Sequence, residues 1–227
     1  MADPLTPAVI IGASGGIGAA LAEALREEDI PVRAFARSLP GPDHLDLTDE
    51  AGIAAAAATL TTPPRLVIVA TGTLGDPEKA MAQLDPAALA HQFAINAIGP
   101  ALVAKHFLPL QPRTGRTVFA VLSARVGSIG DNRLGGWYGY RAAKAALNQL
   151  VRTLAIEHRR RNDRSIVVGL HPGTVDTALS RPFQASVAAD QLFSPGRAAV
   201  QLLDVIDGLR AVDSGWLFAW DGAEITP

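Results

Sequence analysis

The stretch YRAAK places Tyr140 four residues before Lys144, and these two side-chain types can perform acid-base chemistry together. Residues four apart share one face of a helix, so both side chains can project into the same crevice. A phenol is a poor base at neutral pH, but a nearby ammonium favours the phenolate and lowers its pKa. Tyr138, the other tyrosine of the chain, would lie about 240° around the helix from Lys144 and is expected to pack. The spacing predicts an acid-base pair, although surface helices also carry such pairs by chance.

A glycine-rich turn precedes the first expected helix. In VIIGASGGIGAALAEAL, Gly12, Gly16 and Gly18 separate a β-branched run from a helical stretch. Glycine permits a tight turn, and a helix N-terminus offers free amide groups and a partial positive charge to a phosphate. The pattern predicts a pyrophosphate site. Glycines that serve only close packing of helix against strand are the alternative.

The end of the second expected strand indicates which dinucleotide would bind. Sites for NAD place an acidic residue there to hold the ribose hydroxyls, whereas a 2′-phosphate calls for arginine. VRAFARS has Ala36 where the acid would stand, followed by Arg37 and Ser38. A guanidinium offers phosphate a planar fork of donors, and Ser14 adds a hydroxyl from the glycine turn. The residues favour NADP(H) over NAD(H), with a solvated arginine at a strand end as the alternative.

Short β-branched runs alternate with longer helical stretches, which is typical of βαβ units around a parallel sheet. The expected strands, most of them apolar throughout as strands covered on both faces are, span 7–12, 31–36, 65–70, 116–123, 165–171 and 215–220. The expected helices span 17–28, 49–60, 86–110, 137–161 and 195–209. We therefore expect one α/β domain over residues 1–227, a doubly wound parallel sheet of the Rossmann type.

The binding crevice of such a sheet lies in the loops beyond the carboxyl ends of its strands. The longest of these loops are 72–85, 124–136 and 172–194. Within the last, residues 178–190 are expected to form a lid over the substrate, with apolar contacts from Leu179, Phe183 and Val187.

These motifs, in this order, resemble those of the short-chain dehydrogenase/reductase family, and the resemblance covers nearly the whole chain. The family's glycine motif matches at the three glycines above, and its Tyr-x-x-x-Lys motif matches Tyr140 to Lys144. HPGTVDT resembles the family's Pro-Gly segment, HLDLTD its adenine-binding segment, and FAINAIGP carries its helix asparagine, Asn96. SARVGSIGDNRLGGWYGYRAAKAALN and the C-terminal WDG are similar to the C-factor-like branch.

The resemblance implies an NADP(H)-dependent oxidoreductase that transfers hydride to or from a small carbonyl or alcohol substrate, with reduction as the expected direction. Tyr140 would be the acid or base, Lys144 would also hold the nicotinamide ribose, and Asn96 would position a water in a proton relay. A buried asparagine satisfied by backbone groups is the alternative for Asn96. Cofactor contacts are expected from Gly12, Ser14, Gly16, Ile17, Gly18, Arg37, Ser38, Asp46, Leu47, Gly72, Tyr140, Lys144, Pro172, Gly173, Val175 and Thr177.

Two departures from the family pattern leave questions open. The family's Asn-Asn-Ala-Gly segment reads VATG here, so only Gly72 agrees. The family's paired serines, of which the second is usually catalytic, read Ser123-Ala124. Ser123 becomes the expected catalytic serine, whose hydroxyl would bond the substrate oxygen, and Ser128 is its rival.

Composition narrows the function classes. Lysine and arginine number 20 against 22 acidic residues, so the net charge of -2 provides no general attraction for nucleic acid or an anionic membrane. No segment approaches the roughly 20 apolar residues of a membrane span, and the five histidines lack metal-ligand spacing. The absence of cysteine suits a reducing cytoplasm. We expect a cytoplasmic protein with no metal, no nucleic-acid or membrane partner, and, by resemblance, a homodimer or homotetramer.

Two other functions stay open. A non-catalytic NADP-binding regulator would keep the fold and use the cofactor state to control a partner, which the missing asparagines and the displaced serine suggest. A sugar-nucleotide epimerase of the family's extended branch ranks last, because too little C-terminal sequence is present for the added substrate domain of that branch.

Overall fold

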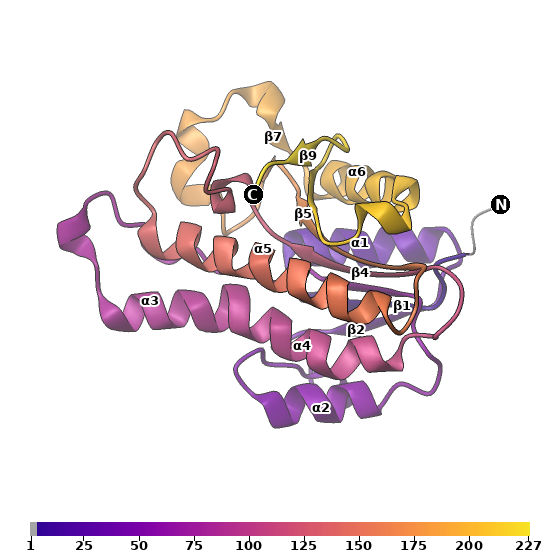
Figure 1. The fold of residues 1–227 in the computed structure, drawn as a ribbon. Helices are drawn as coiled ribbons and strands as arrows, with labels where there is room; N and C mark the ends of the chain where they lie inside the picture. The colour runs from indigo at the N-terminus through magenta and orange to yellow at the C-terminus, as the bar shows by residue number, and fades with distance from the viewer. Residues whose placement is uncertain (1–3) are drawn as a thin grey trace.

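The computed structural model describes residues 4–227, and over this range it confirms a single α/β domain around a seven-stranded sheet (Figure 1). The strands of this sheet are β1 (Ala8–Ile11), β2 (Val32–Phe35), β3 (Leu66–Val69), β4 (Thr117–Leu122), β5 (Ser165–His171), β8 (Leu217–Ala219) and β9 (Glu224–Ile225). Their order is β2-β1-β3-β4-β5-β8-β9, and the β8–β9 pairing alone is antiparallel in the described chain. The expected doubly wound parallel sheet is therefore confirmed, while the short return strand β9 was not foreseen.

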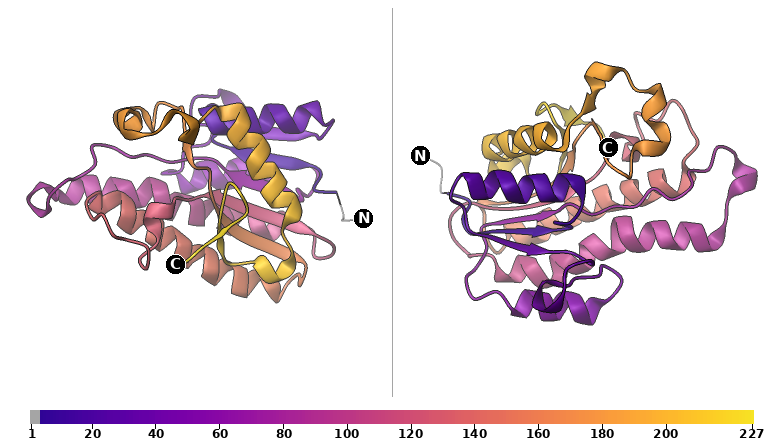
Figure 2. Two further views of the ribbon diagram at one scale, coloured as in Figure 1. Left: turned by 90° about the horizontal axis from the view of Figure 1, so that it is seen from above. Right: turned by 180° about the vertical axis from the view of Figure 1, so that it is seen from behind.

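Helices cover both faces of the sheet (Figures 1 and 2). α1 (Gly16–Glu27) and α6 (Pro195–Gly208) lie on one face, and α2 (Glu50–Ala58), α4 (Gly99–Phe107) and α5 (Tyr138–Arg159) lie on the other. In β3, Leu66 and Ile68 pack toward α1 and α6, whereas Val67 and Val69 pack toward the opposite layer. Successive strand side chains point to opposite faces, which is why β1 and β3 are apolar at every position and β4 and β5 at most of theirs.

The expected helix 86–110 is divided in the structure. α3 (Pro86–Phe93) leads into a π-helical turn over Ala94–Ile98, and α4 follows. Gly99 donates its amide to the carbonyl of Ala94, five residues back. Pro100 has no N–H, so the carbonyl of Asn96 loses the donor that an α-helix would supply from four residues ahead. The helical hydrogen-bond pattern therefore widens from i→i+4 to i→i+5 around Asn96, the residue that the sequence predicts to be functional.

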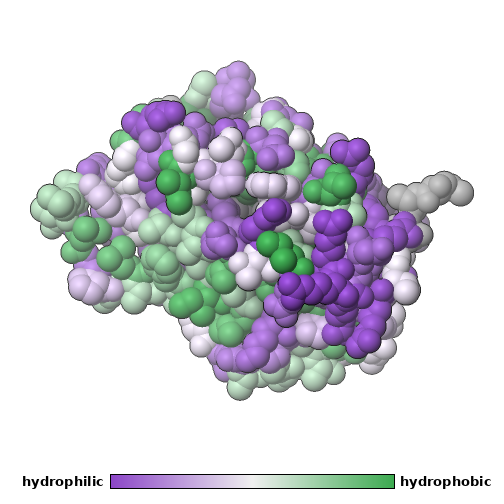
Figure 3. Space-filling model, viewed as in Figure 1, coloured by the Kyte–Doolittle hydropathy of each residue, from purple (hydrophilic) through white to green (hydrophobic). Residues whose placement is uncertain are grey.

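By length and composition the stretch Pro86–Leu110 could cross a membrane, contrary to the expectation that no segment approaches that limit. In the fold, α3 and α4 pack along α5, and α4 also contacts α2, as a core helix does. Figure 3 shows apolar side chains gathered over α3 and α4, where Leu84 and Ile98 are exposed.

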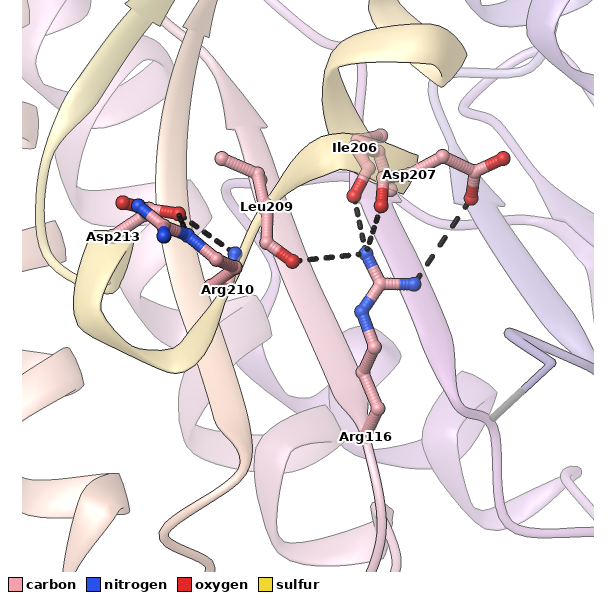
Figure 4. A network of polar contacts seen from close by, with 6 residues as sticks. All are labelled: Arg116, Ile206, Asp207, Leu209, Arg210 and Asp213. Carbon is pink, nitrogen blue, oxygen red and sulfur yellow. Dashed lines mark hydrogen bonds and ion pairs between the residues drawn. The ribbon is translucent and has the colours of Figure 1, made fainter. Parts of the chain in front are cut away.

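Arg116, directly before β4, fixes the C-terminal end of α6 (Figure 4). Its buried guanidinium donates to three main-chain carbonyls at the end of the helix, those of Ile206, Asp207 and Leu209. A cation at a helix C-terminus also interacts favourably with the helix dipole. At its N-terminal end α6 begins with Pro195. The ring of Pro195 lies 3.6 Å from the position that a Cβ on Gly16 would take, so this end of the helix borders the glycine turn.

Candidate active site

The glycine turn joins β1 to α1 at the carboxyl edge of the sheet. A Cβ on Gly18 would stand 2.2 Å from the carbonyl oxygen of Gly12, so no side chain fits there. Gly12 has a φ of +88°, and its amide donates to the carbonyl of Phe35 in β2 at 2.8 Å. No side chain of the described residues caps the first turn of α1. The turn therefore presents main-chain amides to an anion, as a pyrophosphate site requires.

A cavity of about 430 Å³ opens beside this turn at the ends of β1, β2 and β3. It is called the adenosine cavity here because the residues expected to bind that part of a dinucleotide line it. Seven of its lining residues are expected cofactor contacts: Gly12, Ser14, Arg37, Ser38, Asp46, Leu47 and Gly72. Ala36, Arg37 and Ser38 also line it, and Ala36 is buried while Arg37 and Ser38 are exposed. A guanidinium and two hydroxyls thus surround the position where NAD sites carry a carboxylate.

Asp46 is held in place by Thr48. The Thr48 amide and hydroxyl donate to Asp46 Oδ1 at 2.8 and 2.7 Å, and these bonds hold the pKa of Asp46 below its ordinary value. The charges of Arg37 and His44 lower this pKa further. Asp46 therefore stays ionised near neutral pH, and it lines the cavity as a hydrogen-bond acceptor.

A second cavity of about 530 Å³ continues from the first, and it is called the catalytic cavity here because the expected acid-base pair lines it. Its expected site residues are Gly16, Ile17, Gly72, Ser123, Tyr140, Lys144, Pro172 and Thr177. The two cavities share Gly15 and residues 70–73, so they form one trough along the ends of the parallel strands. The lining also includes four residues that were not among the expected ones, Ala70, Thr71, Thr73 and Leu74, although their position directly after β3 predicts such a role.

Three expected cofactor residues lie outside the lining of both cavities: Gly18, Gly173 and Val175. Val175 is buried in β6 (Thr174–Val175), which pairs with β7 (Leu192–Phe193) beside the main sheet. Gly173 approaches the ring of Phe193 so closely that a Cβ would stand 2.7 Å from it. Gly173 and Val175 shape the loop that carries Thr177 rather than the cavity wall, and Gly18 lies in α1 against Gly12.

Tyr140 and Lys144 reach the catalytic cavity from α5, and both are buried. Lys144 Nζ donates to the carbonyl of Leu122 at 2.8 Å and lies 5.8 Å from the centroid of the Tyr140 ring. Burial raises the pKa of Tyr140 to about 12 and lowers the pKa of Lys144 to about 7. The expected lowering of the tyrosine pKa by the ammonium is therefore not found, because loss of hydration outweighs it.

The two tyrosines are separated as expected. Tyr138 is 39% exposed and lies outside the lining of both cavities, whereas Tyr140 is 8% exposed and lines one of them. α5 begins at Tyr138, directly after Trp137, whose backbone is left-handed. Tyr140 follows two residues into the helix.

Asn96 is fully buried in the π-turn, and its amide is bonded on both sides. Its Nδ2 donates to the Thr73 carbonyl at 2.8 Å and to Gln92 Oε1 at 2.6 Å, and its Oδ1 accepts from the Thr73 amide at 3.0 Å. The side chain thus fixes the segment after β3 that both cavities share. The side chain of Asn96 therefore has the alternative role, that of a buried asparagine satisfied by backbone groups. The group of Asn96 that could take part in a relay is its main-chain carbonyl, because Pro100, four residues ahead, has no N–H to donate to it.

The candidate serines occupy different surroundings. Ser123 lines the catalytic cavity, but its Oγ donates to Asn148 Oδ1 at 2.6 Å. Ser128 Oγ accepts the Asp131 amide at 3.0 Å in a turn, outside the lining of both cavities. Ala124 packs in an apolar cluster with Tyr140, so a methyl group lies where the family pattern has its second serine.

The first part of the segment 178–190, which is expected to form a lid, borders the catalytic cavity. Ala178, Leu179 and Pro182 line the cavity, and Phe183 contacts the ring of Trp137 at a centroid distance of 5.2 Å. Val187, also expected to contact substrate, is outside the lining. The segment therefore supplies an apolar wall from its first half.

Comparison with known proteins agrees with this architecture. The sequence profile described as short chain dehydrogenase matches residues 6–188. C-signal of Myxococcus xanthus is 36% identical over 146 residues, which are 64% of this chain and 82% of that protein. The 1-hydroxy-2-glutathionyl-2-methyl-3-butene dehydrogenase of Rhodococcus sp. (strain AD45) is 29% identical over 96% of this chain and 98% of its own length. A structure of a short-chain dehydrogenase/reductase from Burkholderia multivorans with bound NADP has a TM-score of 0.82 at 26% identity, covering 99% of this chain and 100% of that one.

Proposed function

Because the chain belongs to the short-chain dehydrogenase family, we propose that it is an NADP(H)-dependent oxidoreductase that interconverts a small carbonyl compound and its alcohol. The observation that carries this proposal is the trough itself. It runs from a glycine turn and Arg37 at one end to Tyr140 and Lys144 at the other. A dinucleotide needs such a continuous site, because its phosphates and its reactive ring bind in neighbouring parts of one crevice.

The residues of the trough fit NADP(H). A side chain at Gly18 would collide with the carbonyl oxygen of Gly12. Because the turn carries no side chain there, its main-chain amides can hold the pyrophosphate. Arg37 and Ser38 would hold the 2′-phosphate, Asp46 the adenine, and Lys144 the nicotinamide ribose. When bound, the cofactor supplies or accepts the hydride.

Tyr140 would hold the proton for the substrate oxygen. A phenol with its pKa raised to about 12 stays protonated, so in reduction it can donate a hydrogen bond and then the proton to the oxygen as charge develops there. Lys144 Nζ, held by the Leu122 carbonyl, faces the same phenol. The carbonyl of Asn96 would hold a water of the relay, while Ser123 is the candidate hydroxyl beside the substrate.

A screen of NADPH oxidation over aldehydes, ketones and quinones tests this function, with two matched variants on one helix. Tyr140→Phe should lower kcat by at least about 100-fold, because general acid catalysis contributes about that much or more. Tyr138→Phe should behave like wild type, since Tyr138 lies outside the cavity. Fluorescence titration with NADPH should give similar affinities for all three proteins, which separates chemistry from binding.

The second candidate is a non-catalytic NADP-binding regulator. Two observations favour it: the hydroxyl of Ser123 donates its hydrogen bond to Asn148, and Ala124 presents a methyl group beside Tyr140. A curated relative is moreover named as a signal rather than an enzyme. If wild type bound NADPH yet Tyr140→Phe matched it in every substrate assay and in cells, this candidate would replace the enzyme.

We also propose that the chain forms a homodimer or a homotetramer. The exposed side chains of Leu84, just before α3, and of Ile98, at the end of the π-turn, support an apolar contact there. Light scattering coupled to size exclusion would measure the oligomeric state, and Ile98→Glu should shift an oligomer toward monomer.

A further inference from the structure

A third cavity, of about 170 Å³, lies between α5, β5 and β8, and it is called the Arg152 cavity here. None of its lining residues lines the trough. Its apolar walls come from Ile129, Val151, Trp216 and Leu217. An apolar cavity of roughly 150 Å³ holds a molecule of benzene. The Arg152 cavity is therefore large enough for a ligand with one six-membered ring.

Arg152 is the one charged side chain that lines this cavity within the described chain. The central carbon of its guanidinium lies 4.3 Å from the centre of the Trp216 ring. Gly215 has a φ of +93°, and a Cβ there would stand 3.0 Å from a guanidinium nitrogen of Arg152, so glycine leaves room for the charged group. Contact with the indole face thus holds the half-buried arginine in one place beside the cavity.

The cavity has hydrogen-bond donors but no acidic side chain. The ion pairs among the described residues include no partner for Arg152. Asn148, one turn earlier on α5, also lines the cavity, and its Nδ2 is buried with no hydrogen-bond partner among the described residues. Pro227 lines it too, but the Pro227 carbonyl already accepts the Gly130 amide at 3.1 Å. A ligand with an acceptor of negative charge would complement these groups.

We propose that the Arg152 cavity is a second ligand site, which binds a small monocarboxylate whose carboxyl group is attached to an apolar ring. The planar guanidinium presents a fork of donors that matches the two oxygens of a carboxylate. The apolar walls would remove the ring from water. This site does not depend on the proposed function, because the cavity and the trough share no residue.

Benzoate is the probe, and heteronuclear NMR follows the indole N–H signal of Trp216 as benzoate is added at constant ionic strength. The chain has three tryptophans, and Trp216→Phe assigns the signal. Benzoate should shift it saturably. Benzamide, which lacks the charge, and acetate, which lacks the ring, should each bind about tenfold or more weakly than benzoate. No saturable shift, or an affinity for benzamide or acetate equal to that for benzoate, would overturn the proposal.

The same titration is repeated with NADPH. Benzoate should bind the Arg152 cavity equally well with and without the nucleotide, whether or not the protein reduces carbonyl compounds. Competition between benzoate and NADPH would place benzoate in the trough and overturn the proposal.

Two matched arginine variants on α5 test the charge. Arg152→Met should weaken benzoate binding about 10- to 100-fold and leave benzamide binding nearly unchanged, because a bond to a charged group is lost. Arg159→Met, which removes an exposed arginine near the end of the same helix, should bind benzoate like wild type. Equal benzoate affinities of the two variants would overturn the proposal.

Two matched alanine variants test the location. Ala145 lines the cavity, so Ala145→Leu should fill part of it and abolish the Trp216 shift. Ala142→Leu, at an exposed position of the same helix, should leave the shift unchanged. Thermal melting checks that both variants fold, and Ala145→Val, with a smaller added side chain, replaces Ala145→Leu if that variant does not. Unchanged benzoate binding in the folded Ala145 variant would overturn the proposal.

Discussion

The hydroxyl of Ser123 donates its proton to Asn148 Oδ1 at 2.6 Å, so in this structure it is not directed at a substrate. Asn148 lies eight residues after Tyr140, about 12 Å further along the axis of α5. Its Nδ2 is buried with no hydrogen-bond partner among the described residues, beside a cavity of about 170 Å³. Asn148 therefore competes with a substrate oxygen for the one proton that Ser123 can donate.

Removal of this competitor should reveal whether Ser123 acts. In Asn148→Ala the hydroxyl is free to turn, and we expect kcat/KM for carbonyl reduction to rise several-fold. Ser123→Ala should lower kcat/KM, and the double variant should match Ser123→Ala, because the gain passes through this hydroxyl. Steady-state kinetics of the three variants measure this coupling. Wild-type kinetics in Ser123→Ala would remove Ser123 from the site.

A hydroxyl at residue 124 tests the methyl group beside Tyr140. We expect Ala124→Ser to raise kcat/KM by up to about tenfold, because a donor near the substrate oxygen stabilises developing charge. The same hydroxyl should lower stability by about 1 kcal/mol, since the cluster around it is apolar. Ser128→Ala is the control, and its kinetics should match wild type because Ser128 only caps a turn. Loss of activity in Ala124→Ser would show that this cluster tolerates no polar group.

The sequence predicted elements and positions well where the signal is local. The strands, the glycine turn and the Tyr140–Lys144 pair each depend on spacing within one segment, and the sheet then brings the ends of its parallel strands to one edge. The π-turn was also readable in principle, because Pro100 lies four residues after Asn96 and cannot donate to its carbonyl.

What the sequence could not predict depends on contacts between segments. Whether the side chain of Asn96 faces a water or the backbone of Thr73 depends on how the loop after β3 folds back, 23 residues away. The partner of Ser123 is 25 residues away on α5. The pKa values of Tyr140 and Lys144 depend on burial, so charge proximity alone predicted the wrong direction for the phenol.

Arg37 tests the cofactor preference. Arg37→Ala should weaken NADPH binding about 10- to 100-fold and leave NADH binding nearly unchanged, because only NADPH carries the 2′-phosphate that the guanidinium would bind. Titration of intrinsic fluorescence measures both affinities. Arg26→Ala, which removes an exposed arginine from the last turn of α1, is the matched control for loss of one positive charge. An equal loss for both cofactors would remove Arg37 from the phosphate site.

Lys144 should destabilise the fold in a pH-dependent way. Its pKa falls from an ordinary value of 10.5 to about 7 on folding. Between these values the unfolded chain holds a proton that the folded chain has released, so stability rises with pH across this window. Below pH 7 both states are charged, and the cost of burying the ammonium is present in full. His171, with a pKa lowered by burial to about 4, contributes only at lower pH, and Tyr140, raised to about 12, only at higher pH.

Replacement of Lys144 by an uncharged side chain should remove this dependence. We expect Lys144→Met to melt a few degrees higher than wild type at pH 6.5, and the difference to shrink steadily as the pH rises to 9.5. Thermal melts at several pH values measure it. Lys105→Met provides the control, because Lys105 is exposed and pairs with Glu50 on the surface, so its offset should show no such decline across the window. A Lys144→Met offset that stayed constant from pH 6.5 to 9.5 would mean that this lysine keeps its proton when the chain folds.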